Sequence, residues 1–223
     1  QGAGYFPVAD KKNQDFYTEK YGAVHPTKAG LKIPQIFDAA ISREIKAVWI
    51  IGEDVVQTDP NSAHVAKAMN ALDLLVVQEI FMSETAKHAD VVLPGTTFLE
   101  KDGTFTNTER RIQRVNKAAE PLPGTKPDGV IVTDMMQKLG YNQKTYDADE
   151  VLKEIADVVP FFKGVSRERL GNLGLQWPVQ EDGTDTKILH KETFKLGKGR
   201  IKYFDWKESQ EIKNNKKDYP LIL

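Results

Sequence analysis

Acidic and amide side chains stand directly after two apolar runs of this sequence. Gly52, Glu53 and Asp54 follow one run, and Gln78 and Glu79 follow the next. At the carboxyl end of a parallel strand, a carboxylate accepts hydrogen bonds from a ribose diol or from guanine N–H groups, and a glycine lets the backbone approach a ligand closely. The pattern therefore indicates a nucleotide-like ligand, with polar loop ends exposed to water as the simpler alternative.

Lys101 is a further candidate, because its ammonium group suits a phosphate or carbonyl oxygen. A solvated loop lysine is the alternative for this residue. Neither G-x-G-x-x-G nor G-x-x-x-x-G-K-[ST] occurs, the four histidines lack metal-ligand spacing, and no serine stands in a G-x-S-x-G elbow. The residues therefore predict neither a catalytic group nor a metal ligand in this chain.

The elements that must position these residues alternate between strand and helix. Apolar spacing, capping residues and first-turn prolines predict a helix from Pro34, a strand at 46–51, a helix capped by Asp59, a strand at 74–77, a short helix capped by Ser83 and a strand at 90–94. This order predicts an α/β fold, a doubly wound and mainly parallel sheet with helices on both faces. The two groups of polar residues then meet at one edge.

After Pro94 the regular alternation of strand and helix ends. Residues 100–115 predict an irregular or hairpin segment with a DG turn, a helix closed by Gly140 follows, and Asp147 or Asp149 begins another helix. Residues 180–206 predict a small irregular or β-rich tail, in which 197–206 form half of a hairpin. The predicted organisation is an irregular connecting segment at 1–33, an α/β domain at 34–145, and a helical and β-rich extension at 146–223.

Composition limits the function. The 223 residues carry a net charge of −1 and no cysteine, which excludes disulfides and any iron-sulfur cluster ligated by this chain. No strongly basic field predicts nucleic-acid binding, and no apolar run approaches the roughly 20 residues of a membrane helix. A cytoplasmic protein is expected. The final "DYPLIL" has the pattern of a strand cut short, so we expect a fragment of a larger polypeptide.

Three stretches together resemble one family: "GEDVVQTDPN", the long run containing "ADVVLP" and "EKDGTFTNTERR", and "KPDGVIVTDMMQKLGY". They are similar to the molybdopterin oxidoreductases, and most closely to the catalytic alpha subunit of molybdenum- or tungsten-dependent formate dehydrogenases. "GNLGLQWP" is also similar to that branch. The resemblance covers nearly the whole chain and implies the third domain of the formate dehydrogenase and DMSO reductase fold, followed by a missing carboxyl-terminal domain.

The resemblance implies a role in holding one of two molybdopterin guanine dinucleotides. Many relatives have "GENP" where this chain has "GEDV", which replaces an amide by an acceptor-only carboxylate. Carried over residue by residue, the implied cofactor-binding positions are Gly52, Glu53, Asp54, Thr58, Gln78, Glu79, Lys101 and Asp128. The parent then oxidises formate to carbon dioxide, with electrons passing through an iron-sulfur cluster bound outside this segment.

The implied partners are the remaining domains of the same subunit and iron-sulfur or NAD-linked electron-transfer subunits, in a bacterial or archaeal cytoplasm. Alone, the fragment is expected to be inactive, because half of a shared cleft buries too little of the ligand. Two alternatives stay open: a free-standing nucleotide-binding or scaffold module, and the same domain from a nitrate reductase or an NADH dehydrogenase large subunit.

Overall fold

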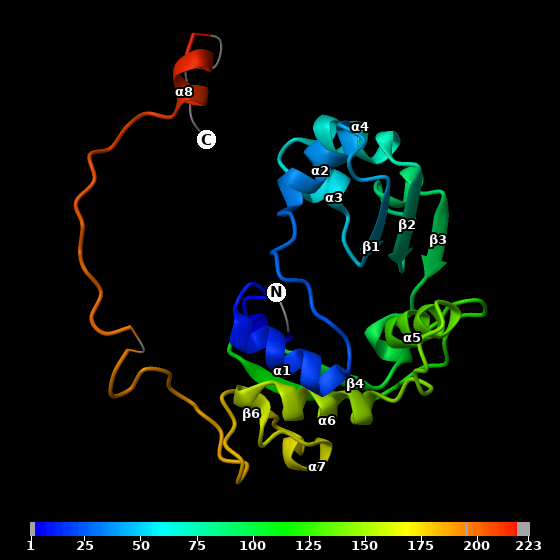
Figure 1. The fold of residues 1–223 in the computed structure, drawn as a ribbon, viewed down its shortest axis with the longest axis vertical. Coiled ribbons are helices and arrows are strands. Elements are labelled where there is room, and N and C mark those ends of the chain that lie inside the picture. Colours follow the sequence, from blue (N-terminus) through cyan, green and yellow to red (C-terminus); the bar gives the residue numbers. More distant parts are fainter. Residues whose placement is uncertain (1–2, 195, 218–223) are drawn as a thin grey trace. The chain divides into compact units, whose positions relative to one another are not determined.

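The computed structural model describes residues 3–194 and 196–217. The chain divides into two compact units, Gln1–Lys187 and Ile188–Leu223. Figure 1 labels the α-helices and most of the strands. Their order is η1 (Ala3–Tyr5), α1 (Lys11–Tyr21), α2 (Ile33–Ile41), β1 (Ala47–Ile51), α3 (Val55–Thr58), α4 (Ser62–Ala71), β2 (Leu74–Glu79), η2 (Ala86–His88), β3 (Val91–Pro94), η3 (Phe98–Glu100), β4 (Gly103–Thr106), β5 (Arg111–Val115), α5 (Asp128–Lys138), α6 (Ala148–Val158), η4 (Pro160–Phe162), α7 (Arg167–Leu170), β6 (Leu175–Gln176) and α8 (Gln210–Asn215).

The first sheet confirms the predicted α/β class. Its strand order is β1-β2-β3 and both pairings are parallel, with Ile51 opposite Gln78 and Glu79 opposite Pro94. The apolar runs of the sequence form these strands. Because the strands are parallel, their carboxyl ends lie along one edge, as Figure 1 shows.

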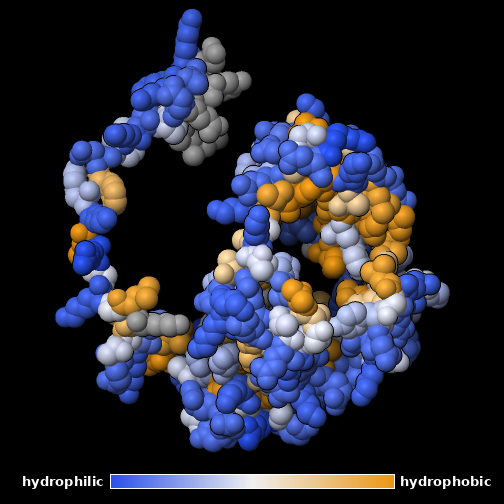
Figure 2. Space-filling view, viewed as in Figure 1, coloured by the Kyte–Doolittle hydropathy of each residue, from blue (hydrophilic) through white to orange (hydrophobic). Residues whose placement is uncertain are grey.

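Helices α2 and α4 pack together on one face of this sheet. Their buried residues join one cluster with alternate residues of the strands, including Ile50, Leu75 and Val77. Right-handed crossovers between strands in the order 1-2-3 place successive connections on the same side of the sheet. The opposite face carries Ile51, Leu74 and Val91, which remain substantially exposed. In Figure 2, hydrophobic side chains gather where this sheet lies.

The helix after β1 differs from the prediction. The sequence placed its start at Pro60 with Asp59 as the cap, whereas the structure has a four-residue helix α3 before it and starts α4 at Ser62. Asn61 is the cap, since its side chain accepts from the backbone N–H of His64 at 3.2 Å. Asp59 instead accepts from the N–H of Asn61 at 3.0 Å, which forms a local turn.

The second sheet of the unit is antiparallel, in the order β4-β5-β6. Of the two alternatives for residues 100–115, the hairpin is correct. Its turn lies at Asn107 to Arg110, where Asn107 N donates to Arg111 O at 3.0 Å, and not at the predicted Asp102-Gly103. Gly103 instead begins β4. Strand β6, only two residues long, pairs with β5 from far along the chain.

The helices α5 and α6 end and begin as predicted. Gly140 follows α5 with a positive φ of 84°, and the Asp147 side chain accepts from the N–H groups of Asp149 and Glu150 at the start of α6. Residues 1–33, predicted to be irregular, contain the eleven-residue helix α1. This helix is polar and buries Tyr17, so its apolar periodicity is weak.

The tail was predicted to be irregular or β-rich, and the irregular alternative is correct, whereas the half-hairpin predicted at 197–206 is wrong. Within residues 180–194 and 196–206 no strand forms, and Val179 makes only an isolated bridge to Asp185. Ile201, Tyr203 and Trp206 are 103%, 89% and 80% exposed. No neighbouring strand in the described part of the chain therefore packs against the apolar side chains of this segment. The predicted final strand "DYPLIL", residues 218–223, lies outside the described residues.

Candidate functional site

The carboxyl ends of β1 and β2 lie side by side. We call this edge of the sheet, with Gly52, Glu53, Asp54, Gln78 and Glu79, the rim. The N–H of Gly52 donates to the carbonyl of Gln78 at 2.9 Å, immediately beyond the last paired residues. Gly52 has a φ of 62°, in the left-handed region that favours glycine, so the chain turns sharply here. This turn leads directly into Glu53 and Asp54. The structure therefore brings together the two polar groups that the sequence places after separate apolar runs.

Glu53 is the most open carboxylate of this rim. Its Oε1 accepts from the hydroxyl of Thr58 at 2.8 Å, and its side chain is otherwise exposed. Thr58, which entered the sequence analysis only through the family resemblance, is thus adjacent to Glu53. The second carboxylate oxygen has no recorded bond within the described chain, so Glu53 retains acceptor capacity for a donor on a ligand.

Asp54 is turned toward its own chain. Its Oδ1 accepts from both the N–H and the hydroxyl of Thr85, at 2.9 and 2.7 Å, and its Oδ2 accepts from the N–H of Glu84 at 3.3 Å. The bond from the Thr85 hydroxyl is the main reason why the pKa of Asp54 lies below its ordinary value. The carboxylate is therefore ionised at neutral pH and already satisfied by internal donors.

Gln78 and Lys101 meet at Asp128. The amide nitrogen of Gln78 donates to Oδ1 of Asp128 at 2.8 Å, and Lys101 forms an ion pair with Oδ2 and donates to the Thr96 carbonyl at 3.3 Å. Burial alone would raise the pKa of Asp128, but the bonds from Lys101 and Gln78 outweigh it and lower that pKa. This group connects the end of β2, the loop before β4 and the first residue of α5.

Gln78 also carries an unsatisfied acceptor. The residue is 1% exposed, and its Oε1 is buried with no hydrogen-bond partner in the described part of the chain. Thr96 is equally buried, and its hydroxyl likewise lacks a partner among those residues. Since buried polar atoms are usually paired, both mark a place where a water or another molecule completes the hydrogen bonding.

Glu79, the last residue of β2, is half-buried. Its Oε1 accepts from the N–H of Ile80 at 2.7 Å, and its carbonyl accepts from the N–H of Gly95 at 3.0 Å. Glu79 thus adds a second carboxylate beside Glu53, on the neighbouring strand.

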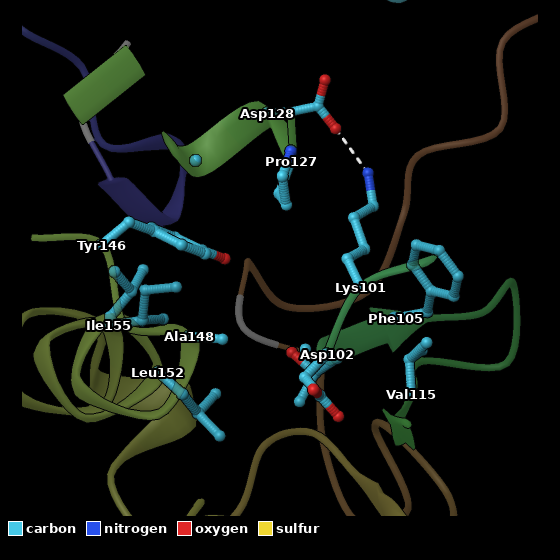
Figure 3. A pocket seen from close by; sticks show the side chains of 14 residues that line it. Lys101, Asp102, Phe105, Val115, Pro127, Asp128, Tyr146, Ala148, Leu152 and Ile155 are labelled. Carbon is cyan, nitrogen blue, oxygen red and sulfur yellow. Dashed lines mark hydrogen bonds and ion pairs between the residues drawn. The ribbon is translucent and has the colours of Figure 1, made fainter. Parts of the chain in front are cut away.

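A cavity of about 230 Å³ opens beside the Lys101–Asp128 pair. Figure 3 shows the pair at one edge of this cavity, with the Tyr146 ring and α6 residues on one side and Phe105 and Val115 on the other. Ligand pockets usually measure about 300–1,000 Å³. The cavity is therefore large enough for a part of a dinucleotide but not for the whole molecule.

Sequence reasoning missed two residues at these sites, Thr85 and Tyr146. Thr85 stands two residues after the predicted cap Ser83, and nothing in the sequence pairs it with Asp54. Tyr146 packs its ring on Gly129, where an added Cβ would lie 2.1 Å from Cε2 of the ring. Burial raises the pKa of the Tyr146 hydroxyl, with a further contribution from Asp128. A glycine in the first turn of α5 was the one available signal.

Two negative findings apply to residues 3–194 and 196–217. No three His, Cys, Asp or Glu side chains in this part of the chain converge to form a metal site. None of the helices found there has both the length and the apolar character needed to cross a membrane.

Comparison with known families identifies the chain. The sequence model described as molybdopterin oxidoreductase matches residues 12–138, more than half of the 223 residues. The chain belongs to the molybdopterin oxidoreductase family. The match contains β1, β2, β3 and the loop of Lys101, and it ends with α5, so the whole rim lies inside the family region. Membership implies a molybdenum or tungsten pterin cofactor for the parent protein.

Several curated relatives of the chain carry the name formate dehydrogenase. The F420-dependent formate dehydrogenase subunit alpha of Methanocaldococcus jannaschii is 44% identical over 200 residues, covering 87% of this chain and 29% of the relative. A putative formate dehydrogenase of Staphylococcus haemolyticus is 42% identical over 205 residues, covering 92% of this chain and 21% of the relative. The chain thus spans less than a third of either protein.

Among solved structures, an acetylene hydratase from Pelobacter acetylenicus aligns with a TM-score of 0.49 and 22% identity. The alignment covers 60% of this chain and 19% of that protein. A likeness of this size says nothing further about fold or function.

Proposed function

We propose that this chain forms part of the site that holds the guanine nucleotide end of a molybdopterin guanine dinucleotide, in the catalytic alpha subunit of a formate dehydrogenase. The observation that carries the proposal is the meeting of Gly52 and Glu53 with Gln78 and Glu79 at the carboxyl ends of adjacent parallel strands. In open parallel sheets this edge is where nucleotides bind. The sequence relatives supply the choice among enzymes of the family.

The donors and acceptors at the rim fit a guanine nucleotide. Glu53 and Glu79 supply acceptors for a ribose diol or for the N1 and N2 donors of guanine, with Thr58 beside Glu53. Lys101 supplies a cation for a phosphate, although in the structure its charge is paired with Asp128. Gly52 keeps the backbone accessible, because an added Cβ there would meet no atom within 4 Å. Asp54 and Gln78 support the site without contacting the ligand: Asp54 is bonded to Thr85, and Gln78 to Asp128.

When bound in the parent, the molybdenum or tungsten cofactor supplies the chemistry that oxidises formate to carbon dioxide. The role of this chain is to bind and orient, and none of its residues is proposed as a proton acceptor or metal ligand. We further propose the bis-molybdopterin guanine dinucleotide form, an iron-sulfur cluster elsewhere in the parent, a cytoplasmic location, and contacts with the remaining domains and electron-transfer subunits. We also propose that the nucleotide-binding domain comprises residues 34–145.

Calorimetric titration of the chain with GDP, GMP and ATP tests this proposal. We expect weak binding of GDP and GMP and weaker binding of ATP, because adenine lacks the N1–H and N2–H donors that match the carboxylates. The variant Glu53→Gln should reduce GDP affinity by roughly 10-fold, the typical effect of losing a hydrogen bond to a charged group. Formate-dependent dye reduction by the chain alone is not expected.

Glu44→Gln is the matched control. Glu44 is an exposed carboxylate just after α2 and has no recorded side-chain bond, so its loss should leave GDP affinity unchanged. Equal affinity for ATP and GDP would favour a general nucleotide-binding module over a guanine site. An unchanged GDP affinity in Glu53→Gln would remove Glu53 from the site.

A further inference from the structure

Two loops at the rim are joined by side-chain hydrogen bonds. One loop runs from β1 to α3 and contains Asp54; the other runs from β2 to η2 and contains Thr85. Asp54 accepts three bonds from Glu84 and Thr85, and the hydroxyl of Thr85 in turn accepts from the N–H of Val56 at 3.0 Å. These four bonds connect positions about 30 residues apart in the sequence.

The side chain of Thr85 is placed for this connection. It is 0% exposed, so a ligand cannot reach its hydroxyl. That hydroxyl donates to Asp54 and accepts from Val56 N–H, which uses both its donor and an acceptor. The Val56 N–H lies in the first turn of α3, where helix N–H groups have no partner within the helix. Thr85 therefore pairs the start of one element with the carboxylate before it.

The connection matters because Glu53 stands inside the loop that it restrains. On its amino-terminal side, Gly52 is held by the bond from its N–H to the Gln78 carbonyl. On its carboxyl-terminal side, α3 has only four residues and its N-cap residue, Asp54, makes no capping bond within the helix. Without the bonds to Thr85, this side of the loop would keep only the bond from Glu84 N–H to Asp54 and the packing of Val55 and Val56 against the core.

We propose that Thr85 is a positioning residue: through Asp54 and Val56 it fixes the loop that presents Glu53 to the nucleotide, and Asp54 serves this link and does not contact the ligand. The inference rests on the proposed function for its ligand. It assigns roles that the sequence did not distinguish, because Glu53 and Asp54 are adjacent carboxylates. Glu53 binds, and Asp54 holds the loop.

The charges around Asp54 agree with this role. Glu53 precedes it on the same loop, and Glu84 and Lys87 on the facing loop pair with each other. The ionised Asp54 accepts its bonds without a cation in contact with it, so the Thr85 and Glu84 donors stabilise its charge. A hydroxyl at position 85 is then required, whereas a methyl group of equal size is not sufficient.

The variants Thr85→Val and Thr85→Ser test the proposal in the intact chain. Amide hydrogen exchange and GDP calorimetry are measured together. In Thr85→Val the amides of Val56, Glu84 and Thr85 should exchange at least on the order of 10-fold faster, and GDP affinity should fall by a similar factor, because bonds to a charged group are lost. Thr85→Ser keeps the hydroxyl and should restore both properties to near wild-type values.

Thr133→Val is the matched control, since Thr133 is a buried threonine of α5 far along the chain with no recorded side-chain bond. It should change neither readout. If Thr85→Val does not fold, Asp54→Ala replaces it and should show the same faster exchange at Glu84 and Thr85. Wild-type exchange and GDP affinity in a folded Thr85→Val would overturn the proposal.

The two proposals fail separately. Absence of GDP binding by the wild-type chain would refute the proposed function. The exchange pattern would still support the link if Thr85→Val accelerates exchange and Thr85→Ser does not, and it would overturn the link if the two variants behave alike.

Discussion

The parallel-sheet region, residues 33–95, and the antiparallel region, residues 98–187, build their cores differently. The core of the first comes from short, consecutive elements: Phe37, Ile50, Val65 and Leu75 belong to α2, β1, α4 and β2 in turn. The core of the second joins residues far apart in the sequence, from Ile112 to Val179. Local apolar runs thus form one core, and long-range pairing forms the other.

The polar contacts of the site lie at the junction between the parallel-sheet region and the antiparallel region. Gln78 lies at the end of the parallel sheet and Lys101 just before the antiparallel one, and Asp128 bonds to both. The rim therefore depends on each region folding and on the contacts between them, which include these side-chain bonds and a backbone bond from Lys126 N–H to the Pro94 carbonyl at 3.1 Å. Variants that affect one region at a time separate these contributions.

The largest effect is expected from removing buried volume in either core. Leu75→Ala and Ile112→Ala, both at positions 1% exposed, should each lower the free energy of unfolding by about 2–5 kcal/mol, because they combine lost burial with a cavity. Urea unfolding measures the loss, and hydrogen exchange locates it. If the regions unfold independently, Leu75→Ala should accelerate exchange in β2 and not in β5.

Leu74→Ala is the control for the first of these variants. Leu74 is the neighbour of Leu75 on the opposite face and is 41% exposed, so its truncation should cost less than about 1 kcal/mol. Equal losses at the two positions would mean that the face carrying Leu74 is covered in solution.

An intermediate effect is expected from the helix caps of the two regions. Asp147 accepts two N–H groups at the start of α6, at 2.9 and 3.0 Å, whereas Asn61 accepts one at the start of α4, at 3.2 Å. Truncation of such caps to alanine costs about 0.5–2 kcal/mol. Asp147→Ala should lie at the upper end of that range and Asn61→Ala at the lower end in thermal or urea unfolding. Asn142→Ala, at an exposed loop residue, is the neutral control. A larger loss of stability in Asn61→Ala than in Asp147→Ala would contradict the expectation from the number of hydrogen bonds.

The smallest effect at neutral pH is expected from Asp54→Asn, which keeps an oxygen acceptor for Thr85. The bond from the Thr85 hydroxyl lowers the pKa of Asp54 in the folded chain relative to an unfolded value of about 3.9. Its ionised form therefore contributes stability that is fully present above the unfolded pKa and is lost as pH falls through the folded pKa. The stability difference between wild type and Asp54→Asn should narrow on acidification.

Urea unfolding of both proteins between neutral pH and the acid limit of folding measures this difference. Glu53, Glu84 and Lys87 are present in both chains, so their contributions to the difference largely cancel. Stability curves that stay parallel down to the lowest pH would show that the charge of Asp54 contributes nothing to the fold.

The sequence alone determined the strands of the parallel sheet and the existence of α2, α5 and α6. Continuous apolar runs bounded by glycine, proline and capping side chains specify these elements locally, and parallel strands bring their carboxyl ends together. For this reason the rim with Glu53 and Gln78 followed from the sequence, whereas Thr58 and Asp128 were named only through the family resemblance.

Only the tertiary structure decided which polar groups stay open at that rim. The pairing of Asp54 with Thr85 and of Gln78 with Asp128 joins segments about 30 and 50 residues apart, and the two-residue strand β6 pairs with β5, more than 50 residues earlier in the chain. Such contacts depend on where distant backbones come to rest, so neighbouring residue types carry no signal of them. Adjacent carboxylates of identical chemistry thus acquire different hydrogen-bond partners, Thr58 for Glu53 and Thr85 with Glu84 for Asp54.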